Sequence, residues 1–111
     1  MRGIINYWGG HNMSMVEKEV IEKIGEYVAK KGGQHREWYL GLAEDPKKAM
    51  FQKHNVDKDT DYWFFKFATD AIEAARIQDK MLMSGFDGEK VSHDAKAIGV
   101  FVYRKRPHTK E

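Results

Sequence analysis

The chain has no cysteine, almost no net charge and no long hydrophobic run. Without cysteine it can form no disulfide, no thiolate zinc site and no cysteine nucleophile, which fits a reducing compartment and leads us to expect a cytoplasmic protein. No apolar run approaches the roughly 18 residues that a membrane-spanning helix needs, so we expect no membrane partner. The N-terminal stretch also lacks the apolar core and small-residue cleavage pattern of a signal peptide.

The charge balance limits the range of partners. The formal net charge is +2 over 111 residues, so the field of the whole molecule is weak, and nucleic-acid binding would need a local basic patch. With 41% hydrophobic and 32% charged residues, the composition is that of one ordinary globular domain. Aromatic residues make up 13%, enough to leave some aromatic surface for a partner.

A strand, a capped turn and a helix are predicted in the centre of the chain. Alternating side chains predict a strand over 38–43, in which Gly41 indicates a bulge or a place where another group approaches the backbone. Asp45 offers an N-cap oxygen and Pro46 fits the first helical position. This helix is expected to run to His54.

Two longer helices flank this centre. Helical periodicity predicts one over 14–31, whose charged residues, Glu17 among them, are interpreted as a solvated face. The other is predicted over 69–84. On its apolar stripe Gln78 is the polar exception, which is expected to be either a hydrogen-bonded core amide or a group facing a cavity.

Two further strands are predicted over 62–68 and 97–104. In the first, Trp63, Phe65 and Phe67 alternate with Tyr62, Phe64 and Lys66, and the side that carries Lys66 is expected to be the wetter one. The aspartates of the loop between 56 and 61 are interpreted as an acidic turn, because the loop lacks the remaining residues of a calcium site. The tail after Pro107 is expected to be frayed.

These elements predict an α+β fold. We expect a small mixed or antiparallel sheet of three to four strands, with three helices packed mainly on one face. Residues 14–111 form the single predicted domain, and residues 1–13 are a leader arm or an extra edge strand.

Part of the chain, 38–109, resembles GIY-YIG nuclease domains. Tyr39-Leu40-Gly41 and the helix ending at His54 are similar to the second half of that motif. A closer similarity is to small uncharacterised bacterial and phage proteins with the ordered pattern W-Y-V-G-I, D-P, H-N-V, G-x-D-G and P-H-T. The matching residues are Trp38, Tyr39, Gly41, Asp45, Pro46, Phe51, His54, Asn55, Val56, Ala74, Ile77, Gly85, Asp87, Gly88, Tyr103, Arg104, Lys105, Pro107, His108 and Thr109.

The resemblance also implies what this chain lacks. In the nucleases an arginine on the helix after Y-I-G orients the phosphate, and a glutamate on a later helix holds a divalent cation such as Mg²⁺ or Mn²⁺. Ala49 stands at the arginine position here, and Gln78 stands at the glutamate position. The resemblance therefore implies the fold, and leaves Tyr39, His54 and Gln78 as candidates for the remnant of a site.

The leading hypothesis is a non-catalytic binding protein without a metal or other cofactor. Aromatic side chains on one sheet face, with basic residues at the rim, would stack on single-stranded nucleic acid or bind a protein partner or a second copy. The face expected is Tyr39, Tyr62, Phe64, Lys66, Phe101 and Tyr103. The expected rim is Lys47, Lys48, Lys53 and Arg104–Arg106, with Gly41 as a further binding position.

Two other hypotheses stay open. One is a divergent metal-dependent phosphodiesterase of GIY-YIG type, with Mg²⁺ or Mn²⁺, in which Tyr39 and His54 act with a nearby carboxylate such as Glu73 or Asp70. The other is a small phage or host-interaction protein that inhibits by occupying a partner's surface.

Overall fold

The computed structural model describes residues 13–89 and 95–111, so the leader or edge strand expected in residues 1–13 falls outside the described residues apart from Met13. Every other predicted helix and strand is present, with bounds within two residues of those expected. The elements are α1 (Met15–Lys31), η2 (His35–Glu37), β1 (Trp38–Ala43), α2 (Pro46–Lys48) continued by the π-helical turn η3 (Ala49–Lys53), β2 (Trp63–Phe67), α3 (Ala71–Met83) and β3 (Gly99–Arg104). Within the described ranges, no helix has the length and apolar character needed to cross a membrane.

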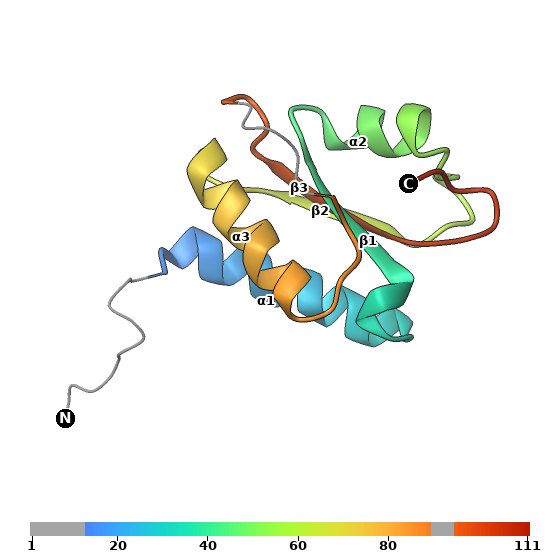
Figure 1. Ribbon diagram of the computed structural model, residues 1–111, viewed down its shortest axis with the longest axis horizontal. Helices are drawn as coiled ribbons and strands as arrows, with labels where there is room; N and C mark the ends of the chain where they lie inside the picture. The colour runs from blue at the N-terminus through green and yellow to red at the C-terminus, as the bar shows by residue number, and fades with distance from the viewer. Residues whose placement is uncertain (1–12, 90–94) are drawn as a thin grey trace.

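The sheet has three strands in the order β1-β3-β2, and both pairs are antiparallel. Figure 1 shows β3 running through the centre of the sheet. A single bridge adds the chain at Asp87 to the outer edge of β1: Leu40 N donates to Asp87 O at 2.8 Å, and Asp87 N donates to Trp38 O at 3.0 Å. Gly88 makes this approach sterically possible, because a Cβ there would lie 2.4 Å from Leu40 O.

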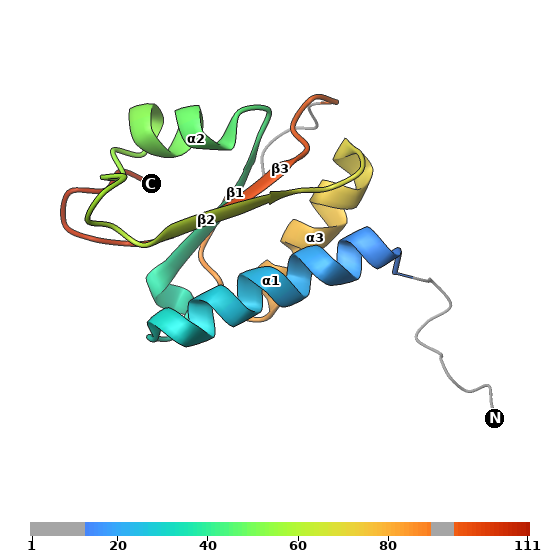
Figure 2. The same cartoon turned by 180° about the vertical axis from the view of Figure 1, so that it is seen from behind.

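Helices α1 and α3 lie side by side on one side of the sheet, which we call the covered face (Figures 1 and 2). Apolar side chains of β1 and β3 interdigitate there with the stripes of the two helices. The buried core of this face is Val20, Ile24, Val28, Trp38, Leu40, Ala68, Ala74, Ile77, Met81, Phe86, Val100 and Val102. Removal of this apolar surface from water is the main driving force for the fold.

The other side of the sheet, which we call the open face, is covered by the short α2–η3 segment, and the C-terminus lies on the same side (Figure 1). A second, smaller cluster of buried residues forms there from Tyr39, Ala49, Met50, Val56, Phe101 and Tyr103. The group that approaches the backbone of Gly41 is the ring of Phe101: a Cβ at this position would lie 2.5 Å from Phe101 Cζ. Gly41 therefore admits an aromatic ring of the neighbouring strand.

The solvated face predicted for α1 is wrong at Glu17. Its side chain is fully buried between α1 and α3, where Lys80 Nζ lies 2.5 Å from one carboxylate oxygen and Arg76 Nε lies 3.4 Å from the other. The Ser14 hydroxyl donates to Glu73 beside them. A buried carboxylate needs such partners, and here they join the two helices of the covered face.

The frayed tail is also a wrong prediction. His108 Nε2 lies 2.6 Å from the buried carboxylate of Asp61, and Asn55 Nδ2 donates to His108 O at 3.0 Å. Lys110 N donates to His54 O at 2.8 Å. The end of the chain is therefore anchored across the loop that follows α2, and this places its last residues beside the open face.

Candidate functional site

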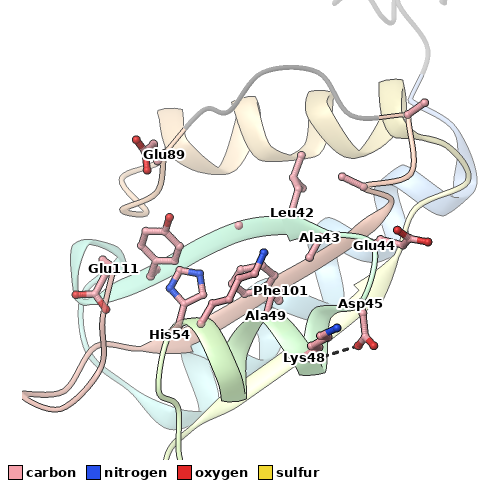
Figure 3. Close-up of a pocket in the computed structure, with 15 residues that line it drawn as sticks. Leu42, Ala43, Glu44, Asp45, Lys48, Ala49, His54, Glu89, Phe101 and Glu111 are labelled. Atoms are coloured by element: carbon pink, nitrogen blue, oxygen red, sulfur yellow. Dashed lines mark hydrogen bonds between the residues drawn. The ribbon is translucent and has the colours of Figure 1, made fainter.

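The open face contains a cavity of about 1090 Å³. Figure 3 shows it between β1, β3, the helix that carries Lys48 and Ala49, and the turn at Glu89. Its floor is largely apolar and includes Gly41, Ala43, Ala49, Ala97 and Phe101. Its charged rim, as we call it from here on, consists of Glu44, Asp45, Lys48, Lys53, His54, Glu89 and Glu111.

The cavity exists because the segment that covers the open face is short. Asp45 caps it by accepting a hydrogen bond from Lys48 N at 3.1 Å, and Pro46 occupies the first turn (Figure 3). The segment ends in a π-helical turn, with His54 N bonded to Ala49 O at 3.0 Å, and Asn55 then leaves it with a φ of 58°. Single π-turns are frequent at functional sites, and this one carries His54 at its end.

His54 is held in one tautomer. Its Nδ1 lies 2.6 Å from the carbonyl oxygen of Lys110, which can only accept a hydrogen bond, so Nδ1 carries the proton of the neutral ring. The lone pair is then on Nε2. Figure 3 shows the imidazole projecting into the cavity, and its ring centroid lies 5.1 Å from that of Tyr39. The arrangement provides a hydrogen-bond acceptor or a base.

Two tyrosine rings lie next to this imidazole: the ring centroid of Tyr39 is 5.1 Å and that of Tyr103 5.4 Å from the centroid of His54. The Tyr103 hydroxyl is 3.0 Å from His54 Nδ1 and donates to Glu111 Oε2 at 2.8 Å. Burial, followed by this bond to Glu111, raises the Tyr103 pKa far above the ordinary value for a phenol. Burial likewise raises the Tyr39 pKa, and the carboxylate of Glu89 adds to the effect. Both phenols therefore stay protonated, and they act as hydrogen-bonding groups rather than as bases.

Six of the predicted face, rim and site residues come together in the cavity: Tyr39, Gly41, Lys48, Lys53, His54 and Phe101. Lys47 lies outside it, with Nζ 5.9 Å from the ring centroid of Phe65.

The predicted aromatic platform is wrong. Tyr103 pairs with both Tyr39 and Trp63, so alternation places Trp63 and Phe65 on the open face and Tyr62 and Phe64 on the covered face. Phe64 stacks on Tyr27 of α1 at 5.1 Å. Tyr103 itself is completely buried. The aromatic residues expected on one surface are thus divided between two sides of the sheet.

The basic residues of the predicted site are divided in the same way. Lys66 lies on the covered face, where its Nζ is 3.9 Å from Glu19, so the expectation that its side is the wetter one is wrong. Arg104 also points to that side and lies 3.5 Å from Gly32 O and 3.6 Å from Glu37. Neither residue can contribute positive charge to the cavity.

Gln78 is a hydrogen-bonded core amide, one of the two predicted alternatives. It is 4% exposed and its Nε2 donates to Glu89 O at 3.4 Å, but it does not line the cavity with Tyr39 and His54. Asp70 and Glu73 do not reach His54 either, because both cap α3: Asp70 accepts from Glu73 N at 2.8 Å, and Glu73 accepts from Thr69 N at 2.7 Å.

The carboxylates that do accompany His54 are Glu89 and Glu111. No sequence signal identifies them, because they lie 35 or more positions away and reach the cavity only through the Asp87 bridge and the anchored tail. In the described ranges, 13–89 and 95–111, no group of three or more His, Asp or Glu side chains is close enough to hold a metal ion.

Comparison with known proteins adds no family to these observations. No protein-family model, no curated protein and no solved structure matches the chain. The likeness to GIY-YIG domains thus stays a prediction that depends on the ordered set of residues between 38 and 109.

Proposed function

We propose that this chain is a non-catalytic binding protein whose cavity takes a segment of a protein partner. The observation that carries the proposal is the charged rim around an apolar floor. Its acidic members are Glu44, Asp45, Glu89 and Glu111, and its lysines are Lys48 and Lys53. Among the described residues of the rim, carboxylates outnumber lysines. A polyanion would therefore meet repulsion there, whereas a peptide with a lysine or arginine next to an apolar side chain finds complementary charge.

The size and polarity of the cavity support the same ligand class. Pockets for drug-sized molecules have volumes of about 300–1,000 Å³, and this cavity of about 1090 Å³ lies above that range. Phe101 and the alanines at positions 43, 49 and 97 offer apolar contact on the floor. Tyr39 offers a hydroxyl, and His54 Nε2 offers a lone pair, to the backbone or side chains of a bound segment.

The resemblance to GIY-YIG domains is compatible with a binding role without catalysis. Ala49, at the position that the resemblance assigns to a phosphate-orienting arginine, lies on the floor of the cavity as a methyl group. Gln78, at the position of the metal-binding glutamate, does not line the cavity. Both groups that would serve phosphodiester cleavage are therefore missing from the place where they would act.

One observation favours a second candidate, a hydrolase in which His54 acts as a general base without a metal. A base whose other nitrogen is fixed by a third group is the usual arrangement in acid–base catalysis. Lys110 O fixes Nδ1 here, and Nε2 could take a proton from an attacking water molecule. The Tyr39 hydroxyl, whose pKa is raised by burial, would stay protonated and could donate to a developing oxyanion.

Fluorescence anisotropy tests the proposal. The probes are a labelled hexapeptide library that varies basic, acidic and apolar positions, and labelled single- and double-stranded DNA and RNA with Mg²⁺ or Mn²⁺ at two salt concentrations. We expect saturable binding of peptides that combine lysine or arginine with an apolar residue. The double variant Glu44→Gln/Glu89→Gln should weaken it at least tenfold. Glu22→Gln on the exposed side of α1 is the matched control and should not change the affinity.

Each other result has a defined meaning. Peptide binding that is equally strong in the Glu44→Gln/Glu89→Gln variant, or absent altogether, would contradict the proposal. Salt-sensitive binding of nucleic acid without cleavage would show that the partner is a nucleic acid rather than a protein segment. Cleavage of a labelled probe that disappears in His54→Ala would establish the hydrolase instead.

A further inference from the structure

The two edge strands of the sheet differ in whether their outer backbone groups are paired. The outer edge of β1 is covered by the bridge to Asp87. On the outer edge of β2 no strand pairs among the described residues, and Figure 2 shows β2 lying in front of β3 with its outer side free of other strands. An unpaired edge exposes backbone donors and acceptors and is a template for pairing with another chain.

The register determines which backbone groups face outward. Arg104 N donates to Tyr62 O at 3.0 Å, and Ala68 N donates to Ile98 O at 2.9 Å. In an antiparallel ladder the residues that bond to one neighbour alternate with those that face away. Trp63, Phe65 and Phe67 therefore direct their N–H and C=O groups away from β3.

Little in the described chain uses these outward groups. Trp63 N donates to the Tyr27 hydroxyl at 3.1 Å. The N–H and C=O groups of Phe65 and Phe67 have no hydrogen-bond partner among the described residues. Helix α1 does not close this edge, because a groove of about 420 Å³ runs between Val16 and Glu19 of α1 and the end of β2.

The same three residues carry a row of rings. Trp63 and Phe65 are stacked with an interplanar angle of 6° and centroids 6.4 Å apart, and Phe67 meets Phe65 edge-on at 5.6 Å. Phe67 is 48% exposed. Free backbone groups and exposed aromatic surface thus coincide at one edge.

We propose that β2 pairs with β2 of a second copy of this chain, antiparallel and about a two-fold axis at Phe65. The outward-facing residues are symmetric about this position: Phe65 meets Phe65 of the second copy, and Trp63 meets its Phe67. Both copies present their free groups in the same phase, so every outward group finds a partner except Trp63 N–H, which is bonded to Tyr27, and the Phe67 C=O that stands opposite it. The dimer then has one continuous sheet of six strands.

Side-chain charge favours the register with its axis at Phe65 over the register with its axis at Lys66. If the axis lay at Lys66, two lysines would stand directly opposite each other, and like charges in that position are destabilising. With the axis at Phe65, Lys66 stands opposite Phe64, and the open face gains aromatic pairs between Trp63 and Phe67. Aromatic cross-strand pairs are among the favourable ones.

The covered edge of β1 explains why the proposed assembly stops at a dimer. A head-to-tail contact of β2 with β1 would repeat without end and produce fibres. The bridge at Asp87 occupies the edge of β1, so the described sheet leaves β2 to pair only with its own symmetry mate.

Analytical ultracentrifugation of the full chain over a wide concentration range tests the pairing, with Phe67→Pro as the variant. Proline removes an outward N–H and none of the bonds to β3, and such positions of edge strands tolerate it. We expect the dimer dissociation constant to rise at least tenfold. The control Ile72→Lys removes an apolar side chain that is 61% exposed on α3 and should leave the constant unchanged.

Amide hydrogen exchange on the unmodified chain gives a second readout that does not depend on a variant. The amides of Phe64 and Lys66, which bond to β3, should be protected at every concentration. Those of Phe65 and Phe67 should be protected only where the chain is dimeric. A monomer at all concentrations, an unchanged constant in Phe67→Pro, or unprotected Phe65 and Phe67 amides in the dimer would overturn the proposal.

Discussion

The two faces of the sheet are built from the same three strands but differ in what covers them. The covered face receives helices of 17 and 13 residues and closes into a larger apolar core. The open face receives a helical segment of 3 residues and a turn of 5, and keeps a cavity lined by aromatic rings and charged groups. The main hydrophobic core and the candidate site thus lie on opposite sides of one sheet. This is possible because neighbouring residues of a strand point to opposite faces.

The largest effect is expected on the covered face. Leu40 is fully buried there, so Leu40→Ala should lower the free energy of unfolding by about 2–5 kcal/mol, through lost transfer energy and the hole left behind. Urea denaturation followed by tryptophan fluorescence measures this change. A loss below about 1 kcal/mol, the range of surface substitutions, would mean that the covered face is not the main core.

A smaller effect is expected one residue along the same strand. Gly41→Ala places a Cβ 2.5 Å from Phe101 Cζ on the open face, so overpacking should cost about 1–3 kcal/mol. Gly25→Ala in α1 is the matched control, since a Cβ there meets nothing within 4 Å and should stabilise the helix by about 0.5–1 kcal/mol. Thermal unfolding of both variants gives the comparison. A Gly41→Ala variant as stable as the unmodified chain would show that the ring of Phe101 moves freely into the cavity.

The smallest effect concerns pH on the covered side. Burial alone would raise the Glu73 pKa, but the hydrogen bonds from Ser14 and Thr69 outweigh it and hold that pKa below the ordinary value of 4.5. A carboxyl with a depressed folded pKa contributes stability above its unfolded pKa and loses it as the pH falls through the folded one. The stability difference between the unmodified chain and Glu73→Gln should therefore be largest near neutral pH and shrink in acid. A difference independent of pH, measured by urea denaturation between pH 7 and 3, would contradict this.

The order of elements could be predicted from the sequence because local signals suffice for it. Capping residues and apolar periodicity locate each helix, as Asp45 with Pro46 does for α2. Alternation within a strand likewise separates Phe65 from Phe64 correctly. These are interactions over a few residues, and they were confirmed throughout the described chain.

The composition of the site could not be predicted, because it depends on pairing between distant segments. Alternation shows which residues of one strand point to the same side of the sheet. It does not show which residues of β2 lie on the same face as a given residue of β1. That depends on the register, in which Tyr39 and Trp63 both pair with Tyr103. The burial of Glu17 depends on cations supplied by another helix. Without the register, Tyr62 and Lys66 could not be separated from Tyr39.

The contact between His54 and the end of the chain has a consequence for mutational scanning. Lys110 fixes the proton of His54 through its carbonyl oxygen, which every amino acid supplies equally. Substitutions at position 110 should therefore be silent, except proline, which lacks the N–H that bonds His54 O, while deletion of 110–111 should free the imidazole to rotate and exchange tautomers. A residue that a scan of side chains would score as dispensable thus holds the proton of the site in place.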